Sequence, residues 1–214
     1  MKTGPDKLPP VVSTAAEESH DPRDVAQWRK AERARLLEER AALSAALRQT
    51  AAELITPHLE ALIRARAGPL EHLIISAWWP IKAELNLRHW LADLVGRGAT
   101  VALPVVLLPG APLGFRRWTP ECRMVQGFWK IPIPADGPEI IPDVSLAPVV
   151  GWDAAGFRLG YGGGYFDRTL AALSPRPFVI GVGLEAAQVD TIFPLPHDIA
   201  MDAVVTEAGL RYPH

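Results

Sequence analysis

The sequence has very little cysteine, since Cys122 is the single one among 214 residues. One cysteine cannot form an intrachain disulfide, and zinc sites built from two or four cysteines are excluded. Nothing in the sequence around Cys122 suggests an activated thiol, so we expect no catalytic role for it. A chain so poor in cysteine is typical of a reducing compartment, and we expect a cytoplasmic protein.

Long hydrophobic runs and an excess of one charge are also absent. No apolar run approaches the ~20 residues that a membrane-spanning helix needs. The first residues, MKTGPDKLPP, lack the apolar core of a secretory signal. The 22 lysines and arginines nearly match the 24 aspartates and glutamates. We therefore expect no membrane partner, and the charge balance argues against a generally basic nucleic-acid-binding protein.

Several catalytic motifs are missing as well. The six histidines show neither the H-x-x-x-H nor the H-E-x-x-H spacing of zinc enzymes. The G-x-S-x-G elbow of serine hydrolases is absent, and so is the G-x-x-x-x-G-K-[ST] loop of many nucleotide-binding proteins. A zinc enzyme, a serine hydrolase and a P-loop protein are thus disfavoured.

What the chain does have is the composition of a globular protein, with 49% hydrophobic and 21% charged residues. Its length fits one domain with a tail. Residues 1–20 combine prolines with mixed charges and show no apolar period, so we expect a disordered tail there. We expect residues 21–214 to form a single domain.

Helix and strand signals alternate along that domain. Asp21 followed by Pro22 predicts the start of one helix, and Ser44 predicts a second that runs to about Arg66. Strands alternating with helices predict an α/β domain with a largely parallel sheet. The other expected helices cover residues 84–95 and the stretch from the glycine cluster to 173, and the expected strands cover 73–79, 100–106, 144–150, 178–182 and 203–206.

The most distinctive segment is residues 156–168, GFRLGYGGGYFDR. Four glycines within positions 160–164 leave backbone amides free where we expect a helix to begin, an arrangement that attracts phosphate. Arg158 and Arg168 add positive charge, and Asp167 offers a carboxylate for a magnesium ion that bridges phosphates. A tight turn with surface charges is the simpler interpretation, and glycine content alone leaves both open.

A second glycine motif lies at residues 181–186, GVGLEA. It follows an expected strand and matches the G-x-G-x-x-A pattern of dinucleotide-binding proteins, with Asp202 at about the right distance. Pro194 and Pro196 would cut the following helix short, and little chain remains for further βαβ units. We therefore favour an ordinary turn after the strand.

Residues 156–168 resemble the signature of the 5-formyltetrahydrofolate cyclo-ligase family. Other segments fall in the family's order, namely WPIKAE at 79–84, WKIP at 129–132, HD at 197–198 and MDAVVTE at 201–207. The resemblance covers the chain from about residue 25 to the end. It implies a three-layer α/β/α fold with a largely parallel central sheet and N-terminal helices packed over a nucleotide site. It also implies that 5-formyltetrahydrofolate is converted to 5,10-methenyltetrahydrofolate with ATP and Mg²⁺, releasing ADP and phosphate.

The resemblance further implies roles for individual residues, and reduced folate and ATP as the partners of a monomer or weak dimer. Catalytic roles fall on Arg158 and Tyr165; ATP contacts on Arg29, Arg158, Leu159, Gly160, Tyr161, Gly162, Gly163, Gly164, Tyr165 and Phe166; folate contacts on Trp79, Glu84 and Trp129; and the metal on Asp167 and Asp198.

Simpler interpretations stay open for three of these residues. Glu84 could be a first-turn glutamate of the expected helix, Trp129 a buried packing residue, and Asp198 an ordinary loop carboxylate.

The sequence also departs from the family's pattern at two positions. Val25 stands where the family has a helix lysine, so Lys30 could reach the phosphates instead. Val106 replaces a tyrosine of some relatives, which bears on folate preference.

Two rival functions remain. One is a non-enzymatic RNA-binding module that uses the basic helix over residues 29–40, and the other is a nicotinamide-dependent oxidoreductase built on residues 181–186.

Overall fold

The computed structural model describes residues 21–212, so the tail expected over residues 1–20 lies outside the described residues. Its centre is a seven-stranded sheet with the order β12-β11-β9-β6-β1-β2-β3. The five inner strands run parallel, and the two edge strands are antiparallel to their neighbours. The strands are β1 (Ile74–Ser76), β2 (Thr100–Val105), β3 (Gly114–Trp118), β6 (Val144–Pro148), β9 (Phe178–Val182), β11 (Ala203–Thr206) and β12 (Gly209–Tyr212).

The two N-terminal helices begin where their capping residues predict. In α1 (Pro22–Ala42) the Asp21 carboxylate accepts a hydrogen bond from the Arg23 amide at 2.8 Å. In α2 (Ala45–Arg66) the Ser44 hydroxyl accepts one from the Leu47 amide at 3.2 Å. These bonds satisfy amide groups that a helix start otherwise leaves unpaired.

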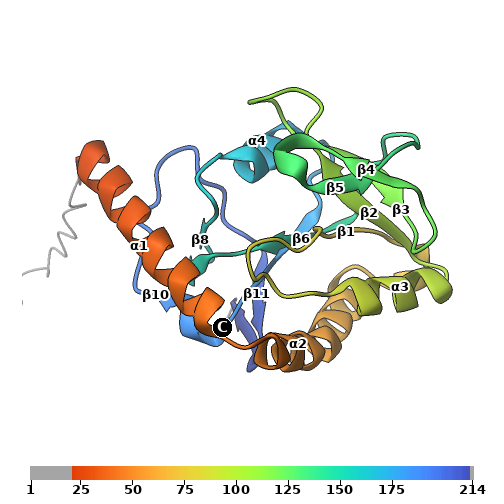
Figure 1. Ribbon diagram of the computed structural model, residues 1–214, viewed down its shortest axis with the longest axis horizontal. Helices are drawn as coiled ribbons and strands as arrows, with labels where there is room; N and C mark the ends of the chain where they lie inside the picture. The colour runs from red at the N-terminus through yellow and green to blue at the C-terminus, as the bar shows by residue number, and fades with distance from the viewer. Residues whose placement is uncertain (1–20, 213–214) are drawn as a thin grey trace, which may run out of the picture.

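Helices cover both faces of the sheet, which confirms the three-layer α/β/α fold (Figure 1). Leu146 and Ile180 face the core formed with α2 and α3 (Arg88–Gly96), whereas their neighbours Ala147 and Val179 face the opposite core. Alternate strand residues point to opposite faces, so each inner strand feeds both cores. The opposite core is closed by α1, α4 (Tyr165–Ala172) and a small sheet of β10 (Gln188–Val189), β7 (Gly151–Asp153) and β8 (Arg158–Leu159).

The remaining elements are short. A two-stranded ribbon pairs β4 (Met124–Gln126) with β5 (Pro132–Pro134) around the turn η2 (Phe128–Lys130), and the other 3₁₀ turns are η1 (Leu70–His72) and η3 (Glu185–Ala187). Within the described residues, no helix is both long enough and apolar enough to cross a membrane.

The segment after β1 differs from the sequence expectation. The strand expected over 73–79 ends at Ser76, and the helix expected over 84–95 begins only at Arg88. Between them runs a loop in which Lys82 and Ala83 have positive φ values of 45° and 61°. Pro80 disfavours helical backbone before it. Glu84 therefore lies in a loop, and the interpretation of it as a first-turn helix residue is wrong.

Candidate active site

A large cavity opens at the carboxyl ends of β1, β2 and β6. Its volume is about 310 Å³, and Ala77, Val106 and Pro148 line it where these strands end. From β1 the sheet grows towards β2 on one side, and from β6 towards β9 on the other. Ligand sites of open α/β sheets lie at such a reversal of strand order.

The cavity collects almost every site residue expected from the sequence. Leu159 is the exception, because its side chain is 1% exposed and packs in the core beside α1. The expected residues that line the cavity are Arg29, Trp79, Glu84, Trp129, Arg158, Gly160, Tyr161, Gly162, Gly163, Gly164, Tyr165, Phe166, Asp167 and Asp198.

The glycine loop leads directly into α4. Gly162 and Gly164 have φ values of +91° and +62°, which side chains with a Cβ rarely adopt. Gly164 is the N-cap of α4 and has no side chain to bond the first helical amides. Free amide groups at a helix start, together with the helix dipole, form a site that attracts anions. The loop over residues 160–164, called the glycine cradle below, thus has a geometry that suits a phosphate-like group.

Two ion pairs, each between a buried arginine and a partly buried aspartate, lie beside this cradle. Arg158 donates to Asp167 at 2.9 Å, and Arg29 donates to Asp198 at 2.6 Å. Burial lowers the pKa of Arg158, although the nearby Asp167 charge opposes the shift. Burial alone would raise the pKa of Asp198, but hydrogen bonds from Arg29 and the Leu195 amide outweigh it and lower that pKa.

The two carboxylates differ in how well they suit a metal ion. Asp167 uses Oδ1 for Arg158 and for the Ile199 amide, while no described residue hydrogen-bonds its Oδ2. Asp198 uses both oxygens for Arg29. Within residues 21–212 no cluster of three or more acidic, histidine or cysteine side chains could hold a metal alone. The donor set fits Mg²⁺ held by one or two carboxylates and substrate phosphates, the usual arrangement for this ion.

Glu84 is the third carboxylate of the cavity, and it is 7% exposed. The Ile81 amide donates to its Oε2 at 2.8 Å, and the Tyr161 hydroxyl donates to its Oε1 at 3.0 Å. Burial raises the pKa of Glu84 above its usual value, against the opposing influence of these donors and of Arg40. Such a carboxylate suits a ligand edge that carries several N–H donors.

Aromatic rings border the same cavity. The guanidinium of Arg88 stacks over the Trp79 ring, with its Cζ 4.7 Å from the ring centroid. Trp129 is 60% exposed and meets the Tyr165 ring edge-on at 5.2 Å, so the interpretation of Trp129 as a buried packing residue is wrong. The Tyr165 hydroxyl accepts a hydrogen bond from the Gly110 amide at 3.0 Å, which fixes the ring against the cavity. Exposed indole and phenol faces offer a stacking surface for a flat ring.

Arg33 is a cavity residue that the sequence analysis did not assign. It lines the cavity one helical turn after Arg29 and donates to the Gly160 carbonyl at 2.9 Å. Burial and the charge of Arg29 lower its pKa. The i, i+4 spacing of the two arginines is the signal that could have identified it. Lys30, by contrast, is exposed and outside the cavity lining, while Val25 is buried.

The rival interpretations lose their structural basis. After β9 the chain forms only the three-residue turn η3, and a Cβ at Gly181 or Gly183 would lie 2.3 Å from a side chain, so these glycines serve packing. The arginines of α1 do not form a free basic face. Arg29, Arg33 and Arg40 turn inwards and donate hydrogen bonds to backbone carbonyls of four distant segments. Arg35 instead forms ion pairs with Glu32 and Glu39 on the same helix.

Together these features define an α/β enzyme whose site can hold an anionic group and a flat polar ring side by side. The 5-formyltetrahydrofolate cyclo-ligase family model matches residues 25–207. This chain therefore belongs to the 5-formyltetrahydrofolate cyclo-ligase family.

Individual relatives agree with that assignment. A 5-formyltetrahydrofolate cyclo-ligase of Mycolicibacterium smegmatis is 32% identical over 193 residues, which cover 86% of this chain and 94% of the relative. A Haemophilus influenzae protein of the same name is 29% identical, with 78% and 90% covered. A 5,10-methenyltetrahydrofolate synthetase structure from Aquifex aeolicus has 24% identity and a TM-score of 0.72, covering 86% of this chain and 91% of that one. That structure supports the fold.

Proposed function

We propose that this enzyme closes the ring of 5-formyltetrahydrofolate to give 5,10-methenyltetrahydrofolate, using ATP and Mg²⁺ and releasing ADP and phosphate. The observation that carries the proposal is the cavity itself. It places the glycine cradle of residues 160–164 and the buried Glu84 in one space, where a nucleotide phosphate and a pterin ring can lie together.

The chemistry needs positioning and charge neutralisation more than it needs an enzymic nucleophile. The formyl oxygen attacks the γ-phosphorus of ATP, and the bond to the β-phosphate oxygen breaks as ADP leaves. The N10 nitrogen then attacks the activated formyl carbon and loses its proton to water. Finally the C–O bond breaks and inorganic phosphate departs, which leaves the methenyl bridge.

The residues divide this work by their chemistry. Arg158 and Arg29 face the transferred phosphoryl group with buried positive charge, alongside the amides at the start of α4. Glu84 accepts hydrogen bonds from the donor edge of the pterin, and Trp79 and Trp129 pack against its rings. Tyr165 lines the same cavity and is, with Arg158, the second proposed catalytic residue.

Asp167 is the proposed magnesium carboxylate, through its free Oδ2. Mg²⁺ would neutralise the charge that develops on the β- and γ-phosphates. Asp198 is the second proposed ligand, and a metal there would compete with Arg29 for its oxygens.

The test is a spectrophotometric assay with purified protein, 5-formyltetrahydrofolate, ATP and Mg²⁺, which follows the near-ultraviolet absorbance of the methenyl product. We expect growth that requires both ATP and the metal. Absence of growth from a folded protein that still binds ATP would mean that the scaffold serves another substrate.

A further inference from the structure

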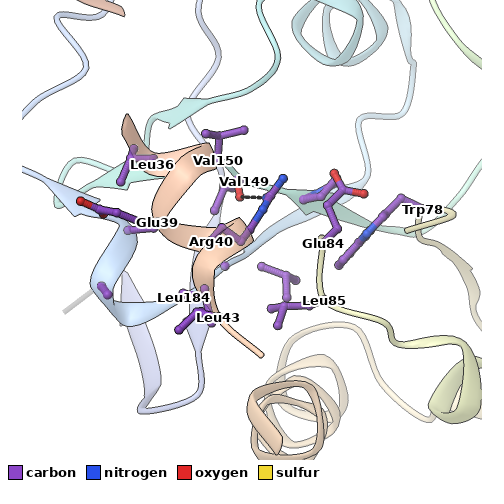
Figure 2. A pocket seen from close by; sticks show the side chains of 15 residues that line it. Leu36, Glu39, Arg40, Leu43, Trp78, Glu84, Leu85, Val149, Val150 and Leu184 are labelled. Atoms are coloured by element: carbon purple, nitrogen blue, oxygen red, sulfur yellow. Dashed lines mark hydrogen bonds between the residues drawn. The ribbon is translucent and has the colours of Figure 1, made fainter. Parts of the chain in front are cut away.

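A second, smaller cavity lies behind Glu84. Its volume is about 110 Å³, and it is lined by α1, the loop after β1 and the ends of β6 and β9. Figure 2 shows Arg40 entering this space from α1, with its hydrogen bond to Val149 dashed and Glu84 on the other side. Glu84 lines both cavities, whereas Arg40 lines only the smaller one. Glu84 thus stands between Arg40 and the main cavity.

A chain of hydrogen bonds joins Arg40 to Glu84. Nη2 of Arg40 donates to the Tyr161 hydroxyl at 2.6 Å, and this hydroxyl donates onward to Oε1 of Glu84 at 3.0 Å. The same Nη2 also donates to the Lys82 carbonyl at 3.2 Å, beside the Ile81 amide that holds Oε2. Both carboxylate oxygens of Glu84 are therefore held by hydrogen bonds from the protein, and the Tyr161 bond is backed by Arg40.

Besides the bonds towards Tyr161 and Lys82, Arg40 makes a long hydrogen bond from its Nη1 to the Val149 carbonyl, at 3.5 Å. It is 8% exposed, and within residues 21–212 no carboxylate lies within the 4.0 Å limit of an ion pair with it. A buried cation without a directly paired anion is costly, and the hydrogen bonds of Arg40 to the Tyr161 hydroxyl and to two backbone carbonyls are what partner it here. The loop it fastens is strained, since Lys82 and Ala83 have positive φ.

We propose that Arg40 and the Tyr161 hydroxyl are positioning residues that hold the Glu84 carboxylate in place, turned towards the main cavity. Tyr161 then has two roles. Its backbone belongs to the glycine cradle, and its hydroxyl holds the Glu84 carboxylate that would bind the folate. The proposal rests on the proposed function, because it assumes that Glu84 accepts hydrogen bonds from the N–H donors of the pterin.

The electrostatics agree with this geometry. The charged or titratable groups around Glu84 are Arg40 and Glu39 on α1, Tyr161 in the glycine loop and Lys82 in its own loop. Arg40, the Tyr161 hydrogen bond and Lys82 each lower the pKa of Glu84 against the effect of burial. Loss of Arg40 or of the Tyr161 hydroxyl should therefore raise the pKa of Glu84 further.

The test measures binding of 5-formyltetrahydrofolate to Tyr161→Phe and Arg40→Gln by tryptophan fluorescence across a pH range, with ATP binding measured in parallel. Each variant should weaken folate binding about tenfold at neutral pH, as expected for a lost hydrogen bond to a charged group, and leave the Kd of ATP unchanged. The acid limb of folate binding should move to higher pH. Arg40→Lys should recover part of the affinity.

Matched controls separate this role from a general loss of structure. Arg35→Gln removes an exposed arginine of the same helix, and Tyr212→Phe removes the hydroxyl of a tyrosine outside the site. Both should bind folate like the wild type. Unchanged folate affinity and pH profile in folded Tyr161→Phe and Arg40→Gln would overturn the proposal, and so would a loss confined to ATP binding.

A titration without substrate keeps the proposal independent of the assay. Carbon NMR of labelled glutamate side chains, with Glu84→Gln to assign the signal, should show a higher Glu84 pKa in both variants than in the wild type. An unchanged Glu84 pKa in both variants would refute the proposed role of Arg40 and Tyr161, even if folate binds. If the wild-type protein binds no folate, the proposed function fails. The change in the Glu84 pKa then still tests whether Arg40 and Tyr161 act on Glu84.

Discussion

At the scale of single residues, the buried Glu84 carboxylate should lower the stability of the fold, although the proposed function uses it to bind folate. Burial raises its pKa from the ordinary value of 4.5, so the folded state binds a proton more readily than the unfolded state. Its contribution to stability is complete below about pH 4.5 and is lost as the pH rises through the folded-state pKa. Glu84→Gln should therefore raise Tm at pH 7 relative to the wild type, with the difference shrinking at pH 4. Thermal melts at both pH values check this, and a gap that grows at pH 4 would contradict it.

Asp167 allows a test of the metal role at the same scale. Asp167→Asn keeps an oxygen for Arg158 and for the Ile199 amide, so the fold should be preserved. The loss of the proposed carboxylate ligand of Mg²⁺, the ion that would neutralise the phosphate charge, should lower Mg²⁺-dependent kcat by about a hundredfold or more. Asp190→Asn, which changes an exposed aspartate, is the control. Wild-type kcat in Asp167→Asn would remove Asp167 from the mechanism.

At the scale of elements, the glycine loop must keep a backbone that other residues resist. Gly162→Ala forces a Cβ onto a residue at φ +91° and should cost about 1–2 kcal/mol of stability, with a marked loss of ATP affinity. Gly96→Ala is the matched control, because this glycine has open space around it and ordinary φ inside α3. It should be neutral or stabilising by about 0.4–1 kcal/mol. Equilibrium dialysis with ATP and urea unfolding measure both effects, and equal ATP affinity in the two variants would argue against a phosphate cradle.

The elements also show where sequence signals suffice. Asp21 and Ser44 announce their helices because capping is local, and β9 and β11 have the bounds that their apolar runs predict. The loop after β1 was mispredicted because apolar residues continue past Ser76 into Trp78 and Trp79. These tryptophans are placed by packing and by the cavity, which a local periodicity does not reveal.

At the scale of the whole molecule, α1 is tied to distant segments by its arginines. Arg29 bonds the carbonyls of Ile192 and Phe193 as well as Asp198, while Arg33 bonds the Gly160 carbonyl. From sequence alone, a helix rich in arginine predicts a face that is exposed to solvent or binds nucleic acid. Which of its charges turn inwards depends on contacts across more than a hundred residues of chain. The family resemblance therefore predicted Arg29 in the α1 wall of the site, whereas Arg33 was not assigned. Of the two N-terminal helices, α1 lines the cavity, while α2 packs against the first core of the sheet.

Because the site joins segments from both ends of the described chain, ligand binding should stabilise the whole domain. A ligand present at about 100 times its Kd adds about 2.7 kcal/mol, which for a domain of this size corresponds to a rise in Tm of about 5–10 °C. We expect such a rise with ATP and Mg²⁺ and, separately, with 5-formyltetrahydrofolate. In Glu84→Gln the folate-dependent rise should shrink while the ATP-dependent rise persists, since the proposed function places the pterin at Glu84 and the phosphates at the glycine loop. Differential scanning fluorimetry with each ligand checks this, and a parallel loss of both rises would mean that Glu84 serves the integrity of the cavity rather than recognition of the folate.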